Sequence, residues 1–154
     1  MTAITRISAL IKTGDRDDAA TDGHVYLGIA GREFRLDSAG PDFQRPTPTE
    51  PFRTYVMGEP PQLPNPNHEV PVNHAERNDP RVDYVLTSEF LDLFPVYIRF
   101  EVSGVSPAST WNLESATITV QTHTGVLATY QNLGGSNNLW LGNNFGKYCY
   151  LLKQ

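Results

Sequence analysis

Apolar and polar residues alternate with a period of two along most of the chain, and no convincing long helical pattern is present. The clearest alternation runs through residues 96–102, where one side is Val96, Ile98, Phe100 and Val102 and the other is Tyr97, Arg99 and Glu101. A strict period of two predicts a strand with one face buried and one in water. The same pattern predicts strands at residues 4–12, 24–30, 32–37, 52–56, 116–121, 126–130, 139–141 and 148–152. About eight short strands with turn signals between them are typical of an all-β, antiparallel β-sandwich.

Turn residues separate these segments. Ala30-Gly31 predicts a tight hairpin turn, because glycine accepts a positive φ without a steric penalty. Gly125 predicts a second hairpin, and Thr87-Ser88-Glu89-Phe90 predicts a capped helical turn in the ambiguous segment 82–94. At 154 residues the chain is expected to form one domain, residues 1–154, with a single core.

Residues 41–80 differ from the rest of the chain because they hold ten of its twelve prolines. Proline cannot donate to a sheet ladder, so a central strand is not expected in most of this region. We expect residues 59–80 to form a long ordered loop. Loops of this length in compact domains are often functional, and a surface insertion without a role is the alternative.

Composition and charge narrow the function classes. Twelve Lys and Arg against seventeen Asp and Glu give a net charge of -5, which argues against nucleic acid as a partner. It also argues against electrostatic docking on anionic lipid, unless a bound cation changes the local sign. The single cysteine, Cys149, excludes an internal disulfide and is expected to be buried in the last strand.

No apolar run is long enough to span a bilayer, and the N-terminus lacks the apolar core of a signal peptide. We therefore expect a soluble chain without a transmembrane segment. A cytoplasmic location is the default expectation, with peripheral membrane association or leaderless export as alternatives.

The most unusual stretch is an acidic segment between two predicted strands, with aspartates at 15, 17, 18 and 22. Two carboxylates about 4 Å apart repel by roughly 1 kcal/mol in water. Open solvent, Arg16 or a hard cation could relieve this repulsion. The spacing does not fit an EF-hand, which needs Gly at the sixth loop position and Glu at the twelfth. Ca²⁺ could still bind if Asp37 and Asp42 add oxygens from another loop, and a solvated acidic turn is the alternative.

The same stretch resembles the opening of PLAT/LH2 family domains. The resemblance rests on Thr13-Gly14-Asp15, on Ala19-Ala20-Thr21-Asp22-Gly23 and on Val25-Tyr26-Leu27. It continues through Phe34-Arg35-Leu36-Asp37, Gly40-Pro41-Asp42-Phe43, Pro95-Val96-Tyr97-Ile98-Arg99-Phe100 and Trp111-Asn112-Leu113, and covers roughly residues 5–121. It implies an eight-stranded β-sandwich of C2-like shape, used for docking to membranes or proteins and in some members assisted by Ca²⁺.

The resemblance also implies a set of Ca²⁺ ligands, carried over position by position: Asp18, the carbonyl of Ala20, Thr21, Asp22 and Asp42. The sequence departs from the family pattern at three places. Ala20 stands where glycine is usual, Pro41 stands where asparagine is usual, and Ser109 and Thr110 precede Trp111 where a carboxylate is usual. Ca²⁺ is therefore expected as an optional ligand, and no cofactor is expected as a requirement.

Other chemical signatures are weak. His68 and His74 lie in the proline-rich region but lack the spacing of a zinc site. No nucleophile elbow and no phosphate-binding glycine loop is present in the sequence. Trp111 and Trp140 are expected in the core, whereas the loop-borne Phe43 and Phe52 are candidates for an exposed apolar contact.

Together these observations predict a non-catalytic docking module that binds a lipid surface or a partner protein. Its expected docking surface is formed by residues 15–22, residues 37–43 and the proline-rich segment. Two other classes stay open. One is a metal-dependent hydrolase that uses the region of His68 and His74, and the other is an adhesive module that binds carbohydrate through exposed aromatic side chains.

Overall fold

The computed structural model describes residues 2–61, 64–102, 110–132 and 139–154. These residues form ten strands and one short 3-10 helix: β1 (Arg6–Thr13), β2 (His24–Ile29), β3 (Arg32–Arg35), β4 (Arg53–Gly58), β5 (Glu69–Pro71), η1 (Ser88–Asp92), β6 (Val96–Glu101), β7 (Thr110–Thr122), β8 (Gly125–Gln131), β9 (Leu139–Gly142) and β10 (Tyr148–Lys153). The predicted all-β class is confirmed. The described residues contain ten strands rather than the expected eight.

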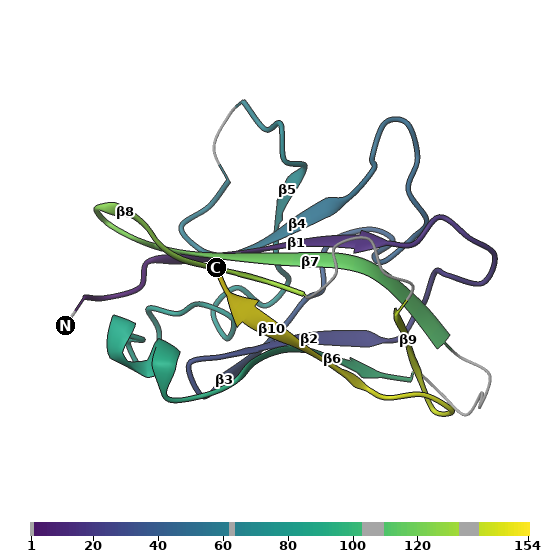
Figure 1. Cartoon of the computed structure of the whole chain (residues 1–154). Helices are drawn as coiled ribbons and strands as arrows, with labels where there is room; N and C mark the ends of the chain where they lie inside the picture. Colours follow the sequence, from purple (N-terminus) through teal and green to yellow (C-terminus); the bar gives the residue numbers. More distant parts are fainter. Residues whose placement is uncertain (1, 62–63, 103–109, 133–138) are drawn as a thin grey trace.

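The strands form two packed layers (Figure 1). One layer contains β1, β4, β7 and β8, with β5 and β9 at its margins, and the other contains β2, β3, β6 and β10. The C-terminal strand β10 joins them, because Tyr148–Leu151 pair with β6 whereas Leu152 and Lys153 pair with β8. Hydrogen bonding is therefore continuous in the order β3-β2-β6-β10-β8-β7-β1-β4-β5. All of these neighbours are antiparallel except β4 and β5, so the predicted β-sandwich is confirmed.

The core lies between the layers and is built from the alternation seen in the sequence. The inward residues are fully or almost fully buried on β1 (Ile7, Ala9, Ile11), β2 (Val25, Leu27, Ile29), β6 (Val96, Ile98, Phe100) and β7 (Ile118, Val120). Trp111 is fully buried, with its ring 5.9 Å from that of Phe100. Cys149 is buried in the last strand, as predicted, and burial raises the pKa of its thiol.

The hairpin between β2 and β3 turns at Ala30 and Gly31, as predicted. Both residues have positive φ, 54° and 78°, which is the conformation of a type I′ turn. The ring of Phe94 lies 3.0 Å from the position that a Cβ on Gly31 would occupy. The hairpin tip therefore packs directly against the segment that precedes β6.

Strand β5 lies inside the proline-rich region, where the sequence pattern predicted a loop. It pairs in parallel with β4 through Thr54↔Glu69, Tyr55↔Val70 and Val56↔Pro71. Pro71 is tolerated because β5 is the last strand of the hydrogen-bonded order, so one of its sides needs no partner. The ion pair between Arg6 and Glu69 attaches the same segment to β1.

The predicted helical turn is present as η1, but Thr87 does not cap it. The Thr87 hydroxyl instead hydrogen-bonds Oε2 of Glu89 at 3.1 Å. Residues at the N-terminus fix this segment, since the amide of Ile4 donates to Leu86 at 2.8 Å and the amide of Ser88 donates to Thr2 at 2.9 Å. Segment 82–94 is therefore attached to the sandwich at both its centre and its C-terminal end.

Candidate functional site

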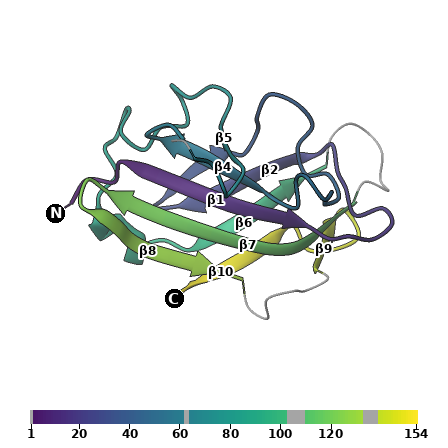
Figure 2. The ribbon, with the colours of Figure 1, turned by 90° about the horizontal axis from the view of Figure 1, so that it is seen from above.

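The acidic segment of the sequence forms the loop between β1 and β2, residues 14–23, which we call the acidic loop. It lies at one end of the sandwich (Figures 1 and 2). Its charge is balanced in part by Arg45, whose guanidinium lies 3.0 Å from Oδ1 of Asp15 and 3.3 Å from Oδ1 of Asp17. Open solvent, Arg16 or a hard cation was expected to relieve the repulsion; Arg45 is 28 residues away from the nearer aspartate, so the local sequence does not indicate it. Asp18 is exposed and has a φ of 62°, a conformation that aspartate tolerates better than most residues.

Backbone hydrogen bonds to Asn112 hold the acidic loop in place. Its backbone amide donates to the carbonyl of Ala19 at 3.0 Å, and its carbonyl accepts from the amide of Gly14 at 2.9 Å. The side-chain amide is fully buried, and neither Oδ1 nor Nδ2 has a hydrogen-bond partner among the described residues. A Cβ on Gly14 would lie 1.9 Å from Oδ1 of Asn112. Glycine in the Thr13-Gly14-Asp15 motif is therefore required by packing.

Next to the acidic loop lies a polar hollow of about 210 Å³. Its lining includes Thr21, Asp22 and Asp42, three of the five predicted Ca²⁺ ligands, together with Asp37, His24 and Arg35. Asp18 and Ala20 do not line it. The loop after β3 thus approaches the acidic loop as the sequence implied, but the five predicted residues do not all face one space.

The carboxylate of Asp42 is already occupied by protein donors. Oδ2 accepts from the amide of Ser38 at 3.0 Å. Oδ1 accepts from the Ser38 hydroxyl at 2.6 Å, from Arg53 at 3.0 Å and from the Tyr55 hydroxyl at 2.9 Å. Burial, followed by the charge of Asp42, raises the pKa of Tyr55, so its hydroxyl stays a donor.

The residues described do not form a ready calcium cage. No three of their His, Cys, Asp and Glu side chains are placed to hold a metal ion. The hydroxyl of Thr21 accepts from the amide of Gly23 at 2.9 Å, and Asp42 would have to leave Arg53 and Tyr55 to become a ligand. The implied ligand set therefore does not fit Ca²⁺ in the arrangement that the protein adopts.

Phe43 separates the polar hollow from a second one, and it is buried rather than exposed. Its ring stacks on Tyr55 with centroids 5.3 Å apart and meets the edge of Trp111 at 5.3 Å. The expectation that Phe43 offers an exposed apolar contact is therefore wrong. The ring stabilises the fold more when it packs in the aromatic cluster of the core than when it is exposed to solvent at the tip of a loop. Phe52 is half-buried and packs edge-on against His68.

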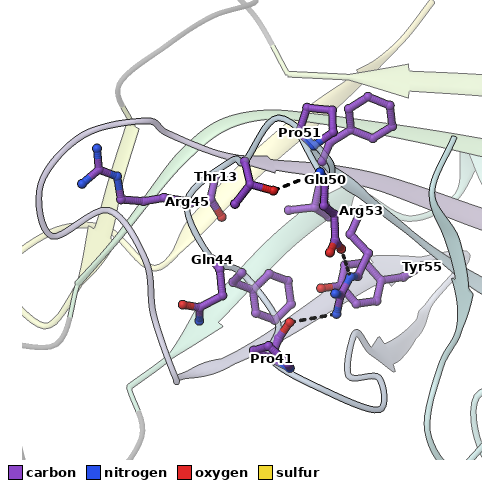
Figure 3. A pocket seen from close by; sticks show the side chains of 12 residues that line it. Thr13, Pro41, Gln44, Arg45, Glu50, Pro51, Arg53 and Tyr55 are labelled. Atoms are coloured by element: carbon purple, nitrogen blue, oxygen red, sulfur yellow. Dashed lines mark hydrogen bonds and ion pairs between the residues drawn. The ribbon is translucent and has the colours of Figure 1, made fainter.

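We call this second space the aromatic hollow; it is lined by Ile11, Phe43, Phe52, Tyr55, Arg45 and Arg53, among others, and measures about 260 Å³ (Figure 3). Arg53 crosses it and is bound by Glu50 at 2.5 Å, which raises the pKa of the guanidinium. Arg45 stands at the rim and points away from Tyr55. The hollow therefore combines an apolar floor with one fixed and one outward-turned guanidinium.

The other sequence candidates are not gathered into sites within the described part of the chain. His74 is exposed and lies 3.9 Å from Glu76, whereas His68 contacts Phe52. No metal-ligating group of three residues surrounds either histidine among those described. Trp111 is buried as expected, and its indole nitrogen donates to Thr13 at 2.9 Å, so it cannot contact a sugar. Trp140 is half-buried and stacks on Phe145.

Segment 82–94 carries an apolar surface that its sequence pattern did not predict. Six large apolar side chains are exposed within these thirteen residues: Val82, Tyr84, Val85, Phe90, Leu93 and Phe94. Tyr84 is 80% exposed and Leu93 is 68% exposed. We call these six residues the apolar surface. By contrast, no large apolar residue of 15–22 or 37–43 is exposed.

The hairpin tip between β2 and β3 contacts the segment that carries the apolar surface and holds it in place. Arg32 donates to the carbonyl of Val82 at 3.2 Å and to that of Asp79 at 2.9 Å, and Phe94 packs on Gly31. A small hollow of about 170 Å³ lies between Phe94, Pro95 and Tyr97. This surface lies at the end of the sandwich opposite to the acidic loop, as both ribbon views show (Figures 1 and 2).

Solved structures of two protein classes share this fold. The α-toxin of Clostridium absonum superposes with a TM-score of 0.61 at 20% identity, covering 97% of this chain and 31% of the toxin chain. The α-toxin of an avian strain of Clostridium perfringens gives 0.58 at 17% identity, covering 96% and 31%. A lipoxygenase gives 0.53 at 15% identity, covering 97% and 16%. No protein-family model and no curated protein matches the sequence.

The chain therefore has the fold of PLAT/LH2 domains, and the predicted resemblance is confirmed at the level of fold. It spans about a third of the toxin chains and about a sixth of the lipoxygenase chain that it resembles. Within the described ranges, no helix is long and apolar enough to cross a membrane.

Proposed function

We propose that this protein is a non-catalytic docking module that contacts a lipid surface through the apolar surface of segment 82–94. The observation that carries the proposal is the exposure of six large apolar side chains within thirteen residues. A concentration of exposed apolar side chains on one segment of a domain favours an interaction site there. The similarity in fold to domains of α-toxins and a lipoxygenase supports a docking role rather than a catalytic one.

Charge decides which end of the sandwich meets the lipid. The net charge is -5, and the acidic loop places Asp15, Asp17, Asp18 and Asp22 at the far end. Those carboxylates repel anionic headgroups, whereas apolar contact does not depend on the sign of the lipid charge. Tyr84 suits an interfacial position because a phenol has an apolar ring and a polar tip. The apolar surface is therefore the better contact with lipid, and a zwitterionic bilayer tests it without the repulsion of the carboxylates.

Calcium is not required in this proposal. Its binding by Asp18, the Ala20 carbonyl, Thr21, Asp22 and Asp42 stays a prediction from the family resemblance, which the bonds made by Asp42 do not favour. Calorimetric titration of the protein with CaCl₂ tests it separately. Absence of heat would remove calcium and leave the docking proposal as it stands.

Sedimentation with phosphatidylcholine vesicles tests the proposed function. We expect the protein to pellet with vesicles to the same extent in CaCl₂ and in EDTA, and to stay in the supernatant without vesicles. A protein that stays in the supernatant under all three conditions is not a lipid-docking module.

A second candidate function is docking onto another protein domain. The observation in its favour is that the fold occupies only 31% and 16% of the matched chains, so in those proteins it is one part of a longer chain. An apolar surface of this kind could then be buried between domains. Two results together would favour this candidate. The protein would fail to pellet with vesicles, and it would form a stable complex with another protein domain only when segment 82–94 is intact.

A further inference from the structure

We propose that the aromatic hollow binds a single-chain anionic amphiphile, a fatty acid, whose tail lies against Phe52 and Ile11 and whose carboxylate pairs with Arg45. This site lies on a different part of the molecule from the apolar surface and does not depend on docking to a bilayer. Three features support this site: the shape of the hollow, the chemistry of its lining, and the difference in how firmly ion pairs hold its two arginines.

The floor and one wall of the hollow are apolar. Ile11, Phe43 and Tyr55 come from the inner side of the sandwich and from the loop after β3, and Pro51 and Phe52 lie just before β4. A volume of about 260 Å³ lies just below the range for ligand pockets, roughly 300–1,000 Å³. The hollow therefore suits one short acyl segment better than a bulky or two-chain lipid.

The two arginines of the lining differ in how firmly they are held. Arg53 is 17% exposed and is fixed by Glu50 at 2.5 Å and Asp42 at 3.0 Å. Arg45 is 46% exposed, and its partners Asp15 and Asp17 are 69% and 100% exposed. Ion pairs between exposed side chains contribute little and are screened by salt. Arg45 is therefore the guanidinium that can exchange its partners.

A ligand carboxylate at the mouth of the hollow would bind Arg45 more strongly than Asp15 and Asp17 do, because less water would surround the ion pair. A guanidinium and a carboxylate can form two parallel hydrogen bonds, and such bonds strengthen as water is excluded. The ring of Phe52 and the acyl chain would exclude water on one side of that pair. Asp15 and Asp17 lose little when they return to solvent, because they are already exposed there.

This exchange predicts opposite effects for two kinds of substitution. Arg45→Gln removes the ligand's partner and should weaken binding at least about tenfold, as expected for a charge-assisted hydrogen bond. Asp15→Asn with Asp17→Asn removes the competitors and a local repulsion, and should tighten binding by about threefold. Both variants change exposed side chains, so both should fold.

The experiment is a titration of the ¹⁵N-labelled full chain with sodium decanoate below its micelle concentration, followed by NMR. Decyltrimethylammonium, which has the same tail and the opposite charge, is the matched control. We expect saturable shifts at Gln44, Arg45 and Phe52 with decanoate, weaker binding of the ammonium, and loss of affinity in Phe52→Ala. Equal binding of both probes, an unchanged affinity in Arg45→Gln, or shifts confined to 82–94 would overturn the inference.

This outcome is independent of the docking proposal. Decanoate binding without vesicle pelleting would leave the amphiphile site standing and remove the proposed function. Vesicle pelleting without decanoate binding would do the reverse.

Discussion

The hydroxyl of Tyr55 donates a 2.9 Å hydrogen bond to Oδ1 of Asp42, and the tyrosine ring itself is buried. Arg53 and Ser38 bind the same oxygen at 3.0 and 2.6 Å. Asp42 therefore joins the loop after β3 to strand β4. Its role in this arrangement is to hold the loop in place.

Replacing Asp42 tests that role. Asp42→Ala leaves the Tyr55 hydroxyl and the Arg53 guanidinium without their shared acceptor, and we expect the free energy of unfolding to fall by about 2–4 kcal/mol. Asp22→Ala is the matched control, because Asp22 is also a predicted calcium ligand but is exposed. Urea unfolding followed by circular dichroism measures both. Equal losses in the two variants would show that Asp42 does not hold the loop.

The two tryptophans should differ in their access to solvent. Trp111 is fully buried, whereas Trp140 is half-buried on Phe145. In Trp140→Phe the remaining Trp111 should emit at short wavelength and resist quenching by acrylamide. In Trp111→Phe the remaining Trp140 should be quenched several-fold more strongly. Strong quenching of Trp111 would contradict its place in the core and restore a surface role for it.

Acid should weaken the outer face of the β2-β3-β6 layer. Arg99 donates two 2.8 Å hydrogen bonds to Glu33, and these bonds hold the pKa of Glu33 below its ordinary value of 4.5. A carboxylate with a lowered pKa in the folded state stabilises the fold above about pH 4.5, and this contribution is lost as the pH falls through the lowered pKa.

Glu33→Gln should therefore lose less stability than the wild type when the pH falls from about 6 to about 3. Glu59→Gln, at an exposed position outside this ion pair, is the control and should follow the wild type. Chemical unfolding at each pH gives the comparison. An identical pH profile for Glu33→Gln and the wild type would contradict the contribution of the Arg99 pair.

Gly28 should be needed for the packing of Tyr97. A Cβ on Gly28 would lie 2.1 Å from the ring of Tyr97, so Gly28→Ala must displace that ring or shift the strand. We expect a loss of about 1–3 kcal/mol in the free energy of unfolding. Gly146→Ala is the control, since nothing lies within 4 Å of its added Cβ. Similar stability in both variants would show that Tyr97 does not lie over Gly28.

The sequence predicts the sandwich well because burial imposes a period of two that is visible without a structure. Residues 96–102 and 24–30 match β6 and β2 closely, and Ala30-Gly31 forms the predicted turn. Strand β5 escapes prediction because proline is unfavourable in a central strand, and only its edge position makes Pro71 acceptable. Edge position is a property of the assembled sheet.

The site was harder to predict because its determinants are distant in sequence. Nothing near Asp15 indicates that Arg45 pairs with it, and nothing near Asp42 indicates that Tyr55 and Arg53 occupy its oxygens. Phe43 looked like a loop-tip contact because it follows Gly40-Pro41-Asp42, yet it packs on Tyr55 and Trp111. The exposed residues of 82–94 showed no period, and apolar residues without a period give no indication of burial.

The most direct test of the central claim is vesicle sedimentation of a variant in the apolar surface. Tyr84→Ser with Leu93→Ser removes its two most exposed side chains, and Phe145→Ser removes an exposed ring from the loop between β9 and β10. With phosphatidylcholine vesicles we predict that the double variant partitions about thirtyfold less than the wild type, since each of the two apolar side chains contributes on the order of 1 kcal/mol. We predict that Phe145→Ser partitions like the wild type. Equal pelleting of the wild type and the double variant, or a loss seen only in Phe145→Ser, would contradict docking through segment 82–94.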